Sequence, residues 1–508
     1  MRWLTFTTFL PLVGVPILLV ARGIHDQIAK SLALVVAIAT FIVSLGILGS
    51  FDSSLGGYQL VESVNWVRSF GLHYTLGIDG ISLWMILLTT FLVPLSILAS
   101  WKIERNVRLY MAAMLMLETA VVGTFCALDL LLFFLFFEAM LVPMYLIIGG
   151  WGGERRVYAA VKFFLYTMAG SAFLFGAILF LYAKSGSLPG GPTFDVRALM
   201  NLPLAGGTAR WLFLAFFVAF AVKVPLFPLH TWLPDAHTEA PTAGSVMLAG
   251  VLLKVGAYGL IRFNLALFPE AARHFSGSVS ILAVIGIVYG AVVALIQTDI
   301  KRLVAYSSVS HLGFVVLGVF AFTNQGVSGG VLQMVNHGLS TGALFLLVGM
   351  VYERTHTRDL GKMGGLATQM PWLTGAFLFA AFASIGLPGL NNFVGEFLVI
   401  LGAFAANHVF GILASTALVL AAIYLLWSYQ RMALGPIRDE HRGLPDVSVR
   451  EVAILAPILA LLLVFGVYPK LVLDRIDPTA AAVVKQVAPT HPTDVGSVGL
   501  TTAPLGGP

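Results

Sequence analysis

The sequence predicts an all-α polytopic membrane protein, and three observations carry this prediction: the composition, the length of the apolar runs and two interruptions within them. Of the 508 residues, 58% are hydrophobic and only 10% are charged, and the mean hydropathy is +0.93. A soluble domain carries about 25% charged residues. Most of the chain is therefore expected to lie in a lipid bilayer. The net charge of +5 is modest and gives no reason to expect a nucleic-acid partner.

The apolar runs have the length of transmembrane helices, because roughly 17–25 residues of helix cross a hydrocarbon core about 30 Å thick. Counted in this way, the chain contains about 14 spans. They cover residues 4–20, 31–50, 79–100, 109–127, 130–149, 158–183, 209–229, 242–263, 277–297, 302–322, 328–350, 371–404, 409–430 and 451–469. We interpret the first run as a span and not as a signal peptide, since its flank carries a single arginine and a poor cleavage site follows it.

Two of the spans are predicted to be broken helices. The seventh contains Pro225 and Pro228 just after Lys223, and the twelfth contains Gly-Leu-Pro-Gly at 386–389. Proline removes a backbone donor and clashes with the preceding turn, and discontinuous helices are tolerated at membrane depth where they line a polar cavity. The two breaks lie an odd number of crossings apart, which predicts two inverted five-helix repeats.

The chain is accordingly divided into five parts. These are helices 1–3 at 1–108, a first inverted repeat with helices 4–8 at 109–263, a second inverted repeat with helices 9–13 at 277–430, helix 14 at 451–475 and a flexible tail at 476–508. Lys and Arg are more numerous in the loops that follow odd-numbered spans than in the other loops. The positive-inside rule then places those loops in the cytoplasm and both termini outside.

Three charged residues inside spans are the first candidates for function. Lys223 and Lys254 each lie within apolar sequence, and Glu138 follows Leu-Leu-Phe-Phe-Leu-Phe-Phe. A charge near the bilayer midplane costs about 2.5–3.5 kcal/mol on insertion scales, so it indicates function by default. We expect both lysines to load and release protons, and Glu138 to pair with a lysine on a facing helix and control its proton. The alternative is a set of static ion pairs that fix helix packing.

Glu396, His311 and His337 are the next candidates. Glu396 lies just past the break at 386–389, where it is expected to be the terminal relay toward one aqueous side or, alternatively, a cap of the second half-helix. His311 and His337 lie in spans ten and eleven among Ser, Asn and Thr residues. With ordered water they are expected to bridge Lys254 to Glu396. A purely structural role is the alternative for each histidine.

Four further residues are auxiliary candidates. His230, Asp235 and His237 lie near the first helix break at the cytoplasmic side, where an entry funnel and a solvated loop remain equal alternatives. Their spacing matches no zinc pattern, so no metal is expected. Glu118 is a second intramembrane acid, on span four, and it is expected either to influence Glu138 or to contact a neighbouring subunit.

The chain carries groups that handle protons and no visible redox chemistry. The single cysteine, Cys126, excludes an internal disulfide framework, a Cys-based iron–sulfur cluster and a Cys-rich zinc site. No Gly-rich phosphate loop precedes a helix, and no haem-ligand pattern is evident. We therefore expect no cofactor in this chain. Asp79, near the end of a span, is expected to be structural.

Several stretches resemble the antiporter-like membrane subunits of respiratory complex I, a family that includes subunits of Mrp-type sodium/proton antiporters and membrane-bound hydrogenases. The resemblance rests on FFEAMLVPMY at 136–145, Lys223 before Pro225, the specific run FPLHTWLPDAHTEAPTAGSVMLAGVLLKVGAYGLIR at 227–262 and SVSHLGF at 308–314. It covers spans three to thirteen. Glu396 is discriminating, because the resemblance implies lysine at this place in the related chains L and N.

The resemblance implies a subunit that pumps a proton, driven by electron transfer elsewhere in the complex. It implies roles for six residues: a coupling pair (Glu138 and Lys223), a central relay (Lys254), a bridge (His311 and His337) and an exit-side residue (Glu396). NADH, flavin, iron–sulfur clusters and quinone would bind to other subunits. The neighbours would be chains L and N, with a long lateral helix of chain L along the flank, and the location would be the bacterial inner membrane.

Two competing functions remain open at this point. One is a subunit of a secondary cation/proton antiporter of the Mrp type, which would share the pathway residues without electron transfer. Glu396 favours the complex I subunit, because the equivalent antiporter chain more often resembles the lysine-bearing type. The other is a structural membrane scaffold with inert ion pairs.

Overall fold

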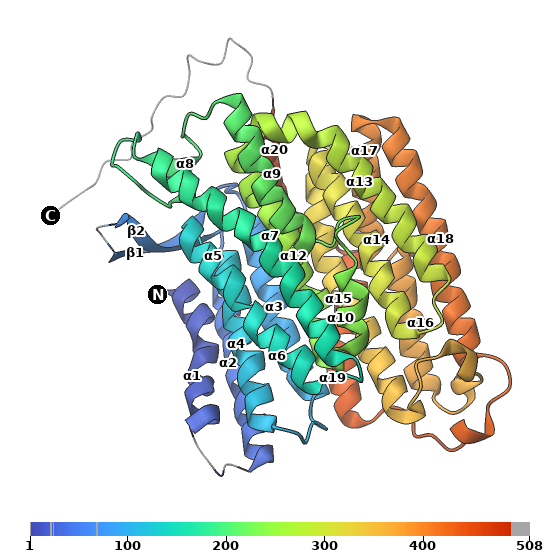
Figure 1. Ribbon diagram of the computed structural model, residues 1–508. Coiled ribbons are helices and arrows are strands. Elements are labelled where there is room, and N and C mark those ends of the chain that lie inside the picture. Colours follow the sequence, from blue (N-terminus) through green and yellow to red (C-terminus); the bar gives the residue numbers. More distant parts are fainter. Residues whose placement is uncertain (1, 21–22, 24, 68–69, 489–508) are drawn as a thin grey trace.

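The predicted spans form helices, and the predicted fold class is confirmed. The computed structural model describes residues 2–20, 23, 25–67 and 70–488. Within these residues, 13 helices are long and apolar enough to cross a membrane. Two shorter apolar helices, Pro371–Ile385 and Asn391–Ala406, follow each other as the halves of the predicted broken twelfth span. The helices lie side by side in one bundle (Figure 1).

The N-terminal part combines three long helices with a β-hairpin. The helices are α1 (Trp3–Val20), α2 (Asp26–Ser50) and α3 (Gly80–Ala99), and strands β1 (Gln59–Val67) and β2 (Leu72–Ile78) pair antiparallel between α2 and α3. The sequence prediction of an all-α chain missed the hairpin, because β1 alternates in character, is mostly exposed and forms no apolar run. Asp79 caps α3 and forms a 2.8 Å ion pair with Arg262, in agreement with a structural role.

The next group of helices ends with a buried central span. Its elements are α4 (Val107–Cys126), α5 (Leu130–Ala139), α6 (Leu141–Trp151), α7 (Arg156–Ser185), α8 (Val196–Leu199), α9 (Gly206–Lys223), α10 (Trp232–Glu239), α11 (Thr242–Met247) and α12 (Leu253–Gly259). Two π-helical segments, η2 (Leu248–Leu252) and η3 (Leu260–Leu265), flank α12 and complete one continuous span. This span is buried along its whole length.

The second half of the bundle contains α13 (Pro269–Leu295), α14 (Ile300–Phe320), α15 (Asn324–Thr355), α16 (Pro371–Ile385), α17 (Asn391–Ala406), α18 (His408–Ala433), α19 (Val449–Val467) and α20 (Lys470–Val487). Short 3₁₀ turns lie at Leu360–Lys362, Leu366–Thr368 and Asp439–His441. Helix α15 is buried along nearly its whole length and packs against α14 and α17. It is therefore the core helix of this half.

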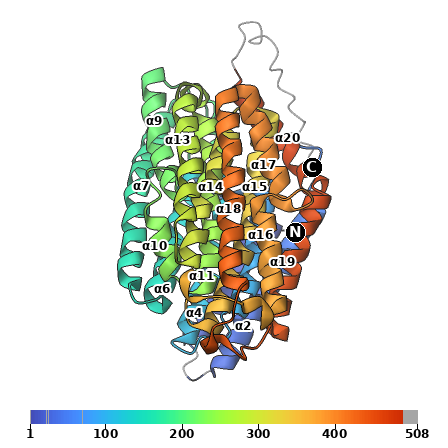
Figure 2. The same cartoon turned by 90° about the vertical axis from the view of Figure 1, so that its right-hand side faces the viewer.

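Both predicted helix breaks are present. Helix α9 ends at Lys223 and α10 begins at Trp232, while α16 ends at Ile385 and α17 begins at Asn391. In the orientation of Figures 1 and 2, the chain descends from α9 to α10 but ascends from α16 to α17. Opposite directions are what inverted repeats require. The repeat boundaries themselves stay a prediction.

The expected flexible tail at 476–508 needs a correction. Residues 476–487 belong to helix α20, which packs against α3 and α15. Its apolar residues recur with helical spacing on one face only, so it has no continuous apolar run of transmembrane length. Residues 489–508 lie outside the described residues.

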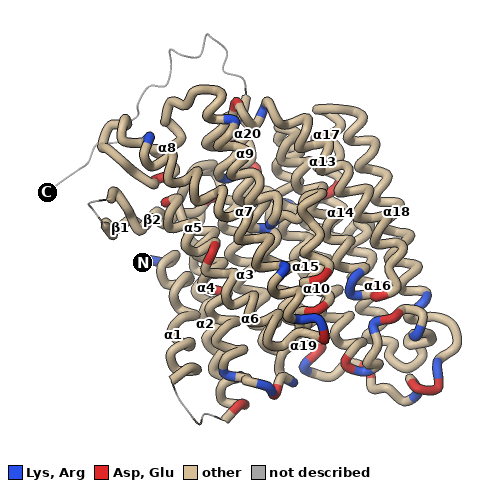
Figure 3. The backbone as a smooth tube through the Cα atoms, in the orientation of Figure 1, with Lys and Arg blue, Asp and Glu red and all other residues tan. Residues whose placement is uncertain are grey.

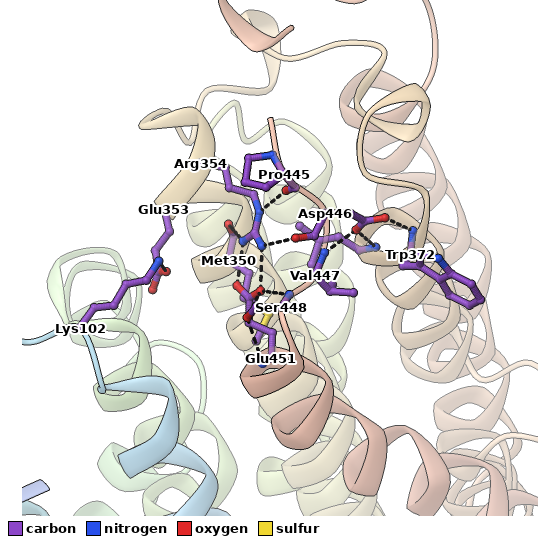
Figure 4. Close-up of polar contacts among 11 residues, drawn as sticks. Lys102, Met350, Glu353, Arg354, Trp372, Pro445, Asp446, Val447, Ser448 and Glu451 are labelled. Carbon is purple, nitrogen blue, oxygen red and sulfur yellow. Dashed lines mark hydrogen bonds and ion pairs between the residues drawn. The ribbon is translucent and has the colours of Figure 1, made fainter. Parts of the chain in front are cut away.

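Charged residues gather at one end of the bundle, where the loop between α18 and α19 lies (Figure 3). At this end, Arg354 of α15 donates to both carboxylate oxygens of Glu451 at 2.8 Å and to the carbonyls of Pro445 and Asp446 (Figure 4). The Asp446 carboxylate accepts a 2.9 Å hydrogen bond from the backbone of Trp372. This cluster fixes the start of α16 to α15 and α19.

Candidate functional site

Lys223 lies at the end of α9, buried among aromatic rings. Its Nζ is 4.7 Å from the ring centroid of Phe137 and 5.9 Å from that of Phe163, and it has no hydrogen-bond partner among the described residues. Such ring contacts attract an ammonium group, the more strongly where water is excluded. The ammonium group of Lys223 is therefore held in this structure by aromatic rings.

The expected direct pair of Glu138 with Lys223 is not formed in this structure. One carboxylate oxygen of Glu138, Oε1, has no hydrogen-bond partner among the described residues. The side chains of Glu138 and Lys223 are nevertheless close enough for their charges to interact. The reason lies in the helix geometry of α5. Phe137 precedes Glu138 by one residue, which is about 100° around the helix, and it is the ring of Phe137 that faces Lys223.

Lys254 lies in α12, between the two π-helical segments. Its Nζ donates to the carbonyl of Ala249, five residues earlier, and lies 2.7 Å from Nδ1 of His337 on α15. A π-helical turn adds a residue to the turn and is frequent at functional sites. Here it accompanies a fully buried lysine that reaches across to the neighbouring helix.

His337, His311 and Glu396 continue from Lys254 across three helices. The ring centroids of His337 and His311 are 5.7 Å apart, and Nδ1 of His311 lies 2.6 Å from Oε1 of Glu396. All four side chains are at most 3% exposed. The structure thus brings together Lys254, both histidines and Glu396, which is the grouping that the sequence predicted.

Glu396 does not cap α17, so the capping alternative is wrong. The residue at the cap position is Leu390, which makes no side-chain cap, and Glu396 lies more than one turn into the helix. Besides His311, the amide of Gln333 donates to Oε1 of Glu396 at 2.8 Å. The second oxygen, Oε2, has no partner among the described residues.

Amide side chains join α15 to α17 beside Glu396. The amide of Asn336 donates to the carbonyl of Asn391 at 2.7 Å, and the amide of Asn391 donates back to the carbonyl of Asn336 at 3.1 Å. Gln333 lies on the same helix, four residues before His337 and hence on the same face. These contacts hold the second half of the broken span in register with the histidine helix.

The three auxiliary candidates at the first break are not joined to one another. His230 packs against Tyr289, with ring centroids 5.2 Å apart, and Asp235 forms a 2.6 Å ion pair with Lys162. His237 is fully buried and stacks on Phe345, and neither of its ring nitrogens has a partner among the described residues. These three residues therefore form no shared hydrogen-bonded cluster, and the entry funnel stays a prediction. A solvated loop is excluded for His230 and His237 by their burial.

A polar cleft of about 420 Å³ opens at the same end as the charged loops. Glu239, Lys301 and Arg358 are among its lining residues. Lys301 is only 8% exposed, and its Nζ donates to the carbonyl of Ala240, just beyond α10. The cleft brings charged groups to the end of α10, the helix that carries His237.

Glu118 is fully buried on α4, and neither of its oxygens has a partner among the described residues. The structure shows no hydrogen bond from it to Glu138. The sequence prediction missed Gln333 and Lys301. Gln333 was detectable in principle, because it shares a helix face with His337. Lys301 follows the start of its span by a single residue and resembles an ordinary loop lysine.

Comparison with known proteins gives two matching family models. The model described as NADH:quinone oxidoreductase/Mrp antiporter, TM, matches residues 127–421, and the one described as NADH-ubiquinone oxidoreductase chain 4, amino terminus, matches residues 28–124. A Rhodobacter capsulatus protein named NADH-quinone oxidoreductase subunit M is 47% identical, over 98% of this chain and 99% of the relative. A subunit M of Mycobacterium tuberculosis H37Rv is 41% identical, over 94% and 93% of the two chains.

Two solved structures are similar along most of the chain. A chain of respiratory complex I from Thermus thermophilus with bound NADH has a TM-score of 0.88 and 34% identity, and the match covers 96% of this chain and 100% of that chain. A chain of the Mrp complex from Dietzia sp. DQ12-45-1b has a TM-score of 0.81 and 20% identity, with coverage of 95% and 99%. The second match shows a shared fold.

Proposed function

The chain belongs to the family of NADH:quinone oxidoreductase and Mrp antiporter membrane subunits, and from this membership we propose that it is the proton-translocating subunit M of an NADH:quinone oxidoreductase. The identity of 47% to a named subunit M, over nearly the full length of both chains, supports this assignment. The expected resemblance to the antiporter-like subunits is confirmed.

The observation that carries the proposal is the buried row of proton-handling groups from Lys254 to Glu396. Lys254 and His337 are hydrogen-bonded at 2.7 Å, and His311 and Glu396 at 2.6 Å. The rings of the two histidines, which lie between these hydrogen bonds, are 5.7 Å apart. Buried ionisable groups are costly in a membrane unless they serve a path for charge. A row of four such groups across four helices exceeds what helix packing requires.

The transfer steps follow from the atoms that face each other. Nζ of Lys254 gives its proton to Nδ1 of His337, and His337 releases a proton from Nε2. His311 takes up a proton at Nε2, across a ring separation that a water molecule or a ring rotation spans, and passes a proton from Nδ1 to Oε1 of Glu396. Each imidazole thus accepts at one nitrogen and donates from the other.

Lys223 supplies the row from the side of the first broken helix. A Cβ placed on Gly256, two residues after Lys254, would lie 2.7 Å from the backbone nitrogen of Val224, the residue that follows Lys223. Helices α12 and α9 are therefore in close contact between the two lysines. A coupling signal that changes the distance between Glu138 and Lys223 changes the hold on the lysine proton, which then moves to Lys254.

The cytoplasmic entry belongs to the polar cleft that Lys301 lines. His237, with both ring nitrogens unpartnered, lies within the electrostatic reach of both Lys301 and Lys254. We assign uptake to this side and release to the side beyond Glu396, with both termini outside. The Lys and Arg residues at the cleft end, Lys301 and Arg358 among them, support this orientation.

The assembly context is proposed on the same basis. Chains L and N would flank this subunit in the bacterial inner membrane, with the lateral helix of chain L along it and lipid around it. NADH, flavin, iron–sulfur clusters and quinone would bind to other subunits, and this chain would hold no cofactor. The Mrp alternative is weaker, because the Mrp match is 20% identical and shows the fold alone.

The proposal is tested with Glu396→Gln in the assembled enzyme. We expect coupled proton translocation in vesicles to be lost, because a glutamine cannot carry a proton onward from His311. The matched control is Glu353→Gln, which removes a carboxylate from the 2.7 Å pair with Lys102 at the bundle end. If Glu396→Gln pumped like the control, the proposed path would be wrong.

A further inference from the structure

We propose that Gln333 is a positioning residue for Glu396, which holds Oε1 toward His311 while the carboxylate is charged. Oε1 then takes the proton from Nδ1 of His311. The neutral carboxyl group, which the amide holds less strongly, turns its O–H to the place of Oε2 and releases the proton at the break between α16 and α17. The inference rests on the proposed function and adds an atom-level direction to it. It also adds a residue that lies outside the titrating row.

The first observation is the asymmetry of the carboxylate contacts. Oε1 of Glu396 has two partners, Nδ1 of His311 at 2.6 Å and Nε2 of Gln333 at 2.8 Å. Oε2 is buried and has no partner among the described residues. Two donors on one oxygen, arriving from two different helices, prevent the carboxylate from rotating freely. While the carboxylate is charged, the oxygen that faces the histidine is therefore Oε1.

The second observation is the place of the free oxygen. A Cβ built on Gly386 would lie 3.6 Å from Oε2, so this oxygen points to the residue that ends α16. Gly386 has a φ of +84°, a conformation that residues with a side chain rarely adopt. The free oxygen thus faces irregular backbone, and irregular backbone at membrane depth is tolerated where it lines a polar path.

The third observation is that Gly395 of α17, which has no side chain, leaves room for the side chain of Gln333. A Cβ on Gly395 would lie 2.5 Å from Oε1 of Gln333 and 3.2 Å from its Cα. Gln333 can therefore reach Glu396 only because the preceding residue has no side chain. The glycine and the glutamine form one steric unit on facing helices.

The chemistry of an amide suits this position. Gln333 donates a hydrogen bond to a charged acceptor, which is stronger than a neutral one, yet it neither takes up nor releases a proton. It therefore orients Glu396 without offering the proton another route. Without it, the charged carboxylate is free to turn away from His311, and the transfer of the proton from Nδ1 of His311 to Oε1 becomes slower.

The test compares Gln333→Met, which keeps the length and removes the donor, with Ser340→Ala on the same helix. Ser340 hydrogen-bonds Asn392 and does not touch Glu396. In vesicles of the assembled enzyme, we expect Gln333→Met to lower coupled turnover by about tenfold, the effect of losing a hydrogen bond to a charged group. Ser340→Ala should leave turnover within about twofold of the parent, as one neutral hydrogen bond is worth little.

A second variant and a spectroscopic measurement distinguish a positioning role of Gln333 from a purely structural one. Gly395→Ala displaces the same amide and should reproduce the loss. Infrared difference spectra should show a shifted Glu396 carboxyl band, assigned with Glu396→Gln, in both variants and not in Ser340→Ala. In the Glu396→Gln background, Gln333→Met should have no further effect on turnover.

The outcomes separate the inference from the proposed function. If Glu396→Gln abolishes pumping but Gln333→Met and Gly395→Ala retain the parent turnover and carboxyl band, Gln333 has no positioning role. If Glu396→Gln itself pumps normally, the proposed path fails instead. If neither variant assembles, the carboxyl band of Gln333→Asn, which keeps the amide one methylene shorter, decides: an unshifted band overturns the inference.

Discussion

The two ends of the proposed path are built differently. At α5 and α9, Glu138 and Lys223 make no direct contact, and the lysine rests on the ring of Phe137. At α14, α15 and α17, His311 and Glu396 are joined at 2.6 Å, with Gln333 on the same carboxylate. The first region is a pair of charges held apart, and the second is a hydrogen-bonded row.

The difference indicates a division of labour. Charges without hydrogen bonds to one another can change their separation at little cost, because no bond must break first. Charges that share hydrogen bonds keep their separation, and a proton can pass along each bond without movement of the helices. The first region is thus suited to receive a coupling signal, and the second to conduct.

The breaks themselves differ in the same sense. Residues 224–231, between α9 and α10, form a long connection that contains Pro225 and Pro228, whereas 386–390 is a short turn with Gly386 and Gly389 in positive φ. The shorter turn positions Glu396 close to its partners. The longer one leaves Lys223 at the end of a helix.

The largest effect is expected from Lys223→Ala, which removes the proton carrier of the first region. Coupled turnover should fall by at least about 100-fold, since loss of a positioned proton-transfer group costs 10²–10⁴-fold. Proton translocation and NADH–quinone activity in vesicles measure it, with assembly checked on native gels. Normal pumping with an intact complex would leave only the scaffold function.

Glu138→Gln should have the next largest effect. The substitution removes the charge that acts on Lys223 but no hydrogen bond between the two side chains. Coupled turnover should therefore fall by about 30-fold, and fewer protons should be pumped per electron pair. Glu118→Gln on α4 is the matched control, because Glu118 makes no hydrogen bond to Glu138. An unchanged stoichiometry in Glu138→Gln would contradict the switch.

Phe137→Leu should reduce coupled turnover by about fivefold, as a ring contact to an ammonium is worth about 1 kcal/mol. Phe137→Tyr retains the ring and should restore turnover. The same substitution at Phe163, 5.9 Å from Nζ, should have the smaller effect of the two. Equal turnover of the leucine and tyrosine variants would show that the ring merely fills space.

Arg354→Met should leave the turnover of the assembled enzyme nearly unchanged and should lower the stability of this subunit against thermal unfolding. Removing one partner of a buried ion pair costs about 3–5 kcal/mol, and Arg354 and Glu451 are 9% and 3% exposed. Lys102→Ala, at an exposed pair, is the control with an expected cost of about 0–1 kcal/mol. Thermal unfolding in detergent compares the two. Equal midpoints would show that the cluster does not hold α16 in place.

Much of the architecture was readable from the sequence because apolar run length and proline or glycine interruptions report directly on helices in a bilayer. The spans, both breaks and the grouping of Lys254, His311, His337 and Glu396 were predicted. The β-hairpin and α20 were missed, because neither contains an apolar run. Their polar and apolar residues alternate or recur on one face, a weaker signal than a continuous run.

The contacts within the site were less predictable. Charge suggested that Glu138 meets a lysine on a facing helix, and the family resemblance implied Lys223. The turn of α5 directs Phe137 to that lysine instead. Gln333 was missed because a single amide in a span carries no charge, and its importance depends on the gap at Gly395 across the interface. Such contacts depend on the direction of the side chains and on the distance between the facing helices, and neither can be predicted from the sequence of one helix.

The central claim is that Lys254 joins the two regions, and Lys254→Ala tests it most directly. Proton translocation in vesicles and NADH–quinone activity are measured together in the assembled complex. The proposed path predicts loss of both, with assembly intact, because Lys254 is the group that lies 2.7 Å from His337 and passes the proton to it in the proposed path. Normal activity with normal pumping would make Lys254 a structural lysine and would contradict the path between the two regions.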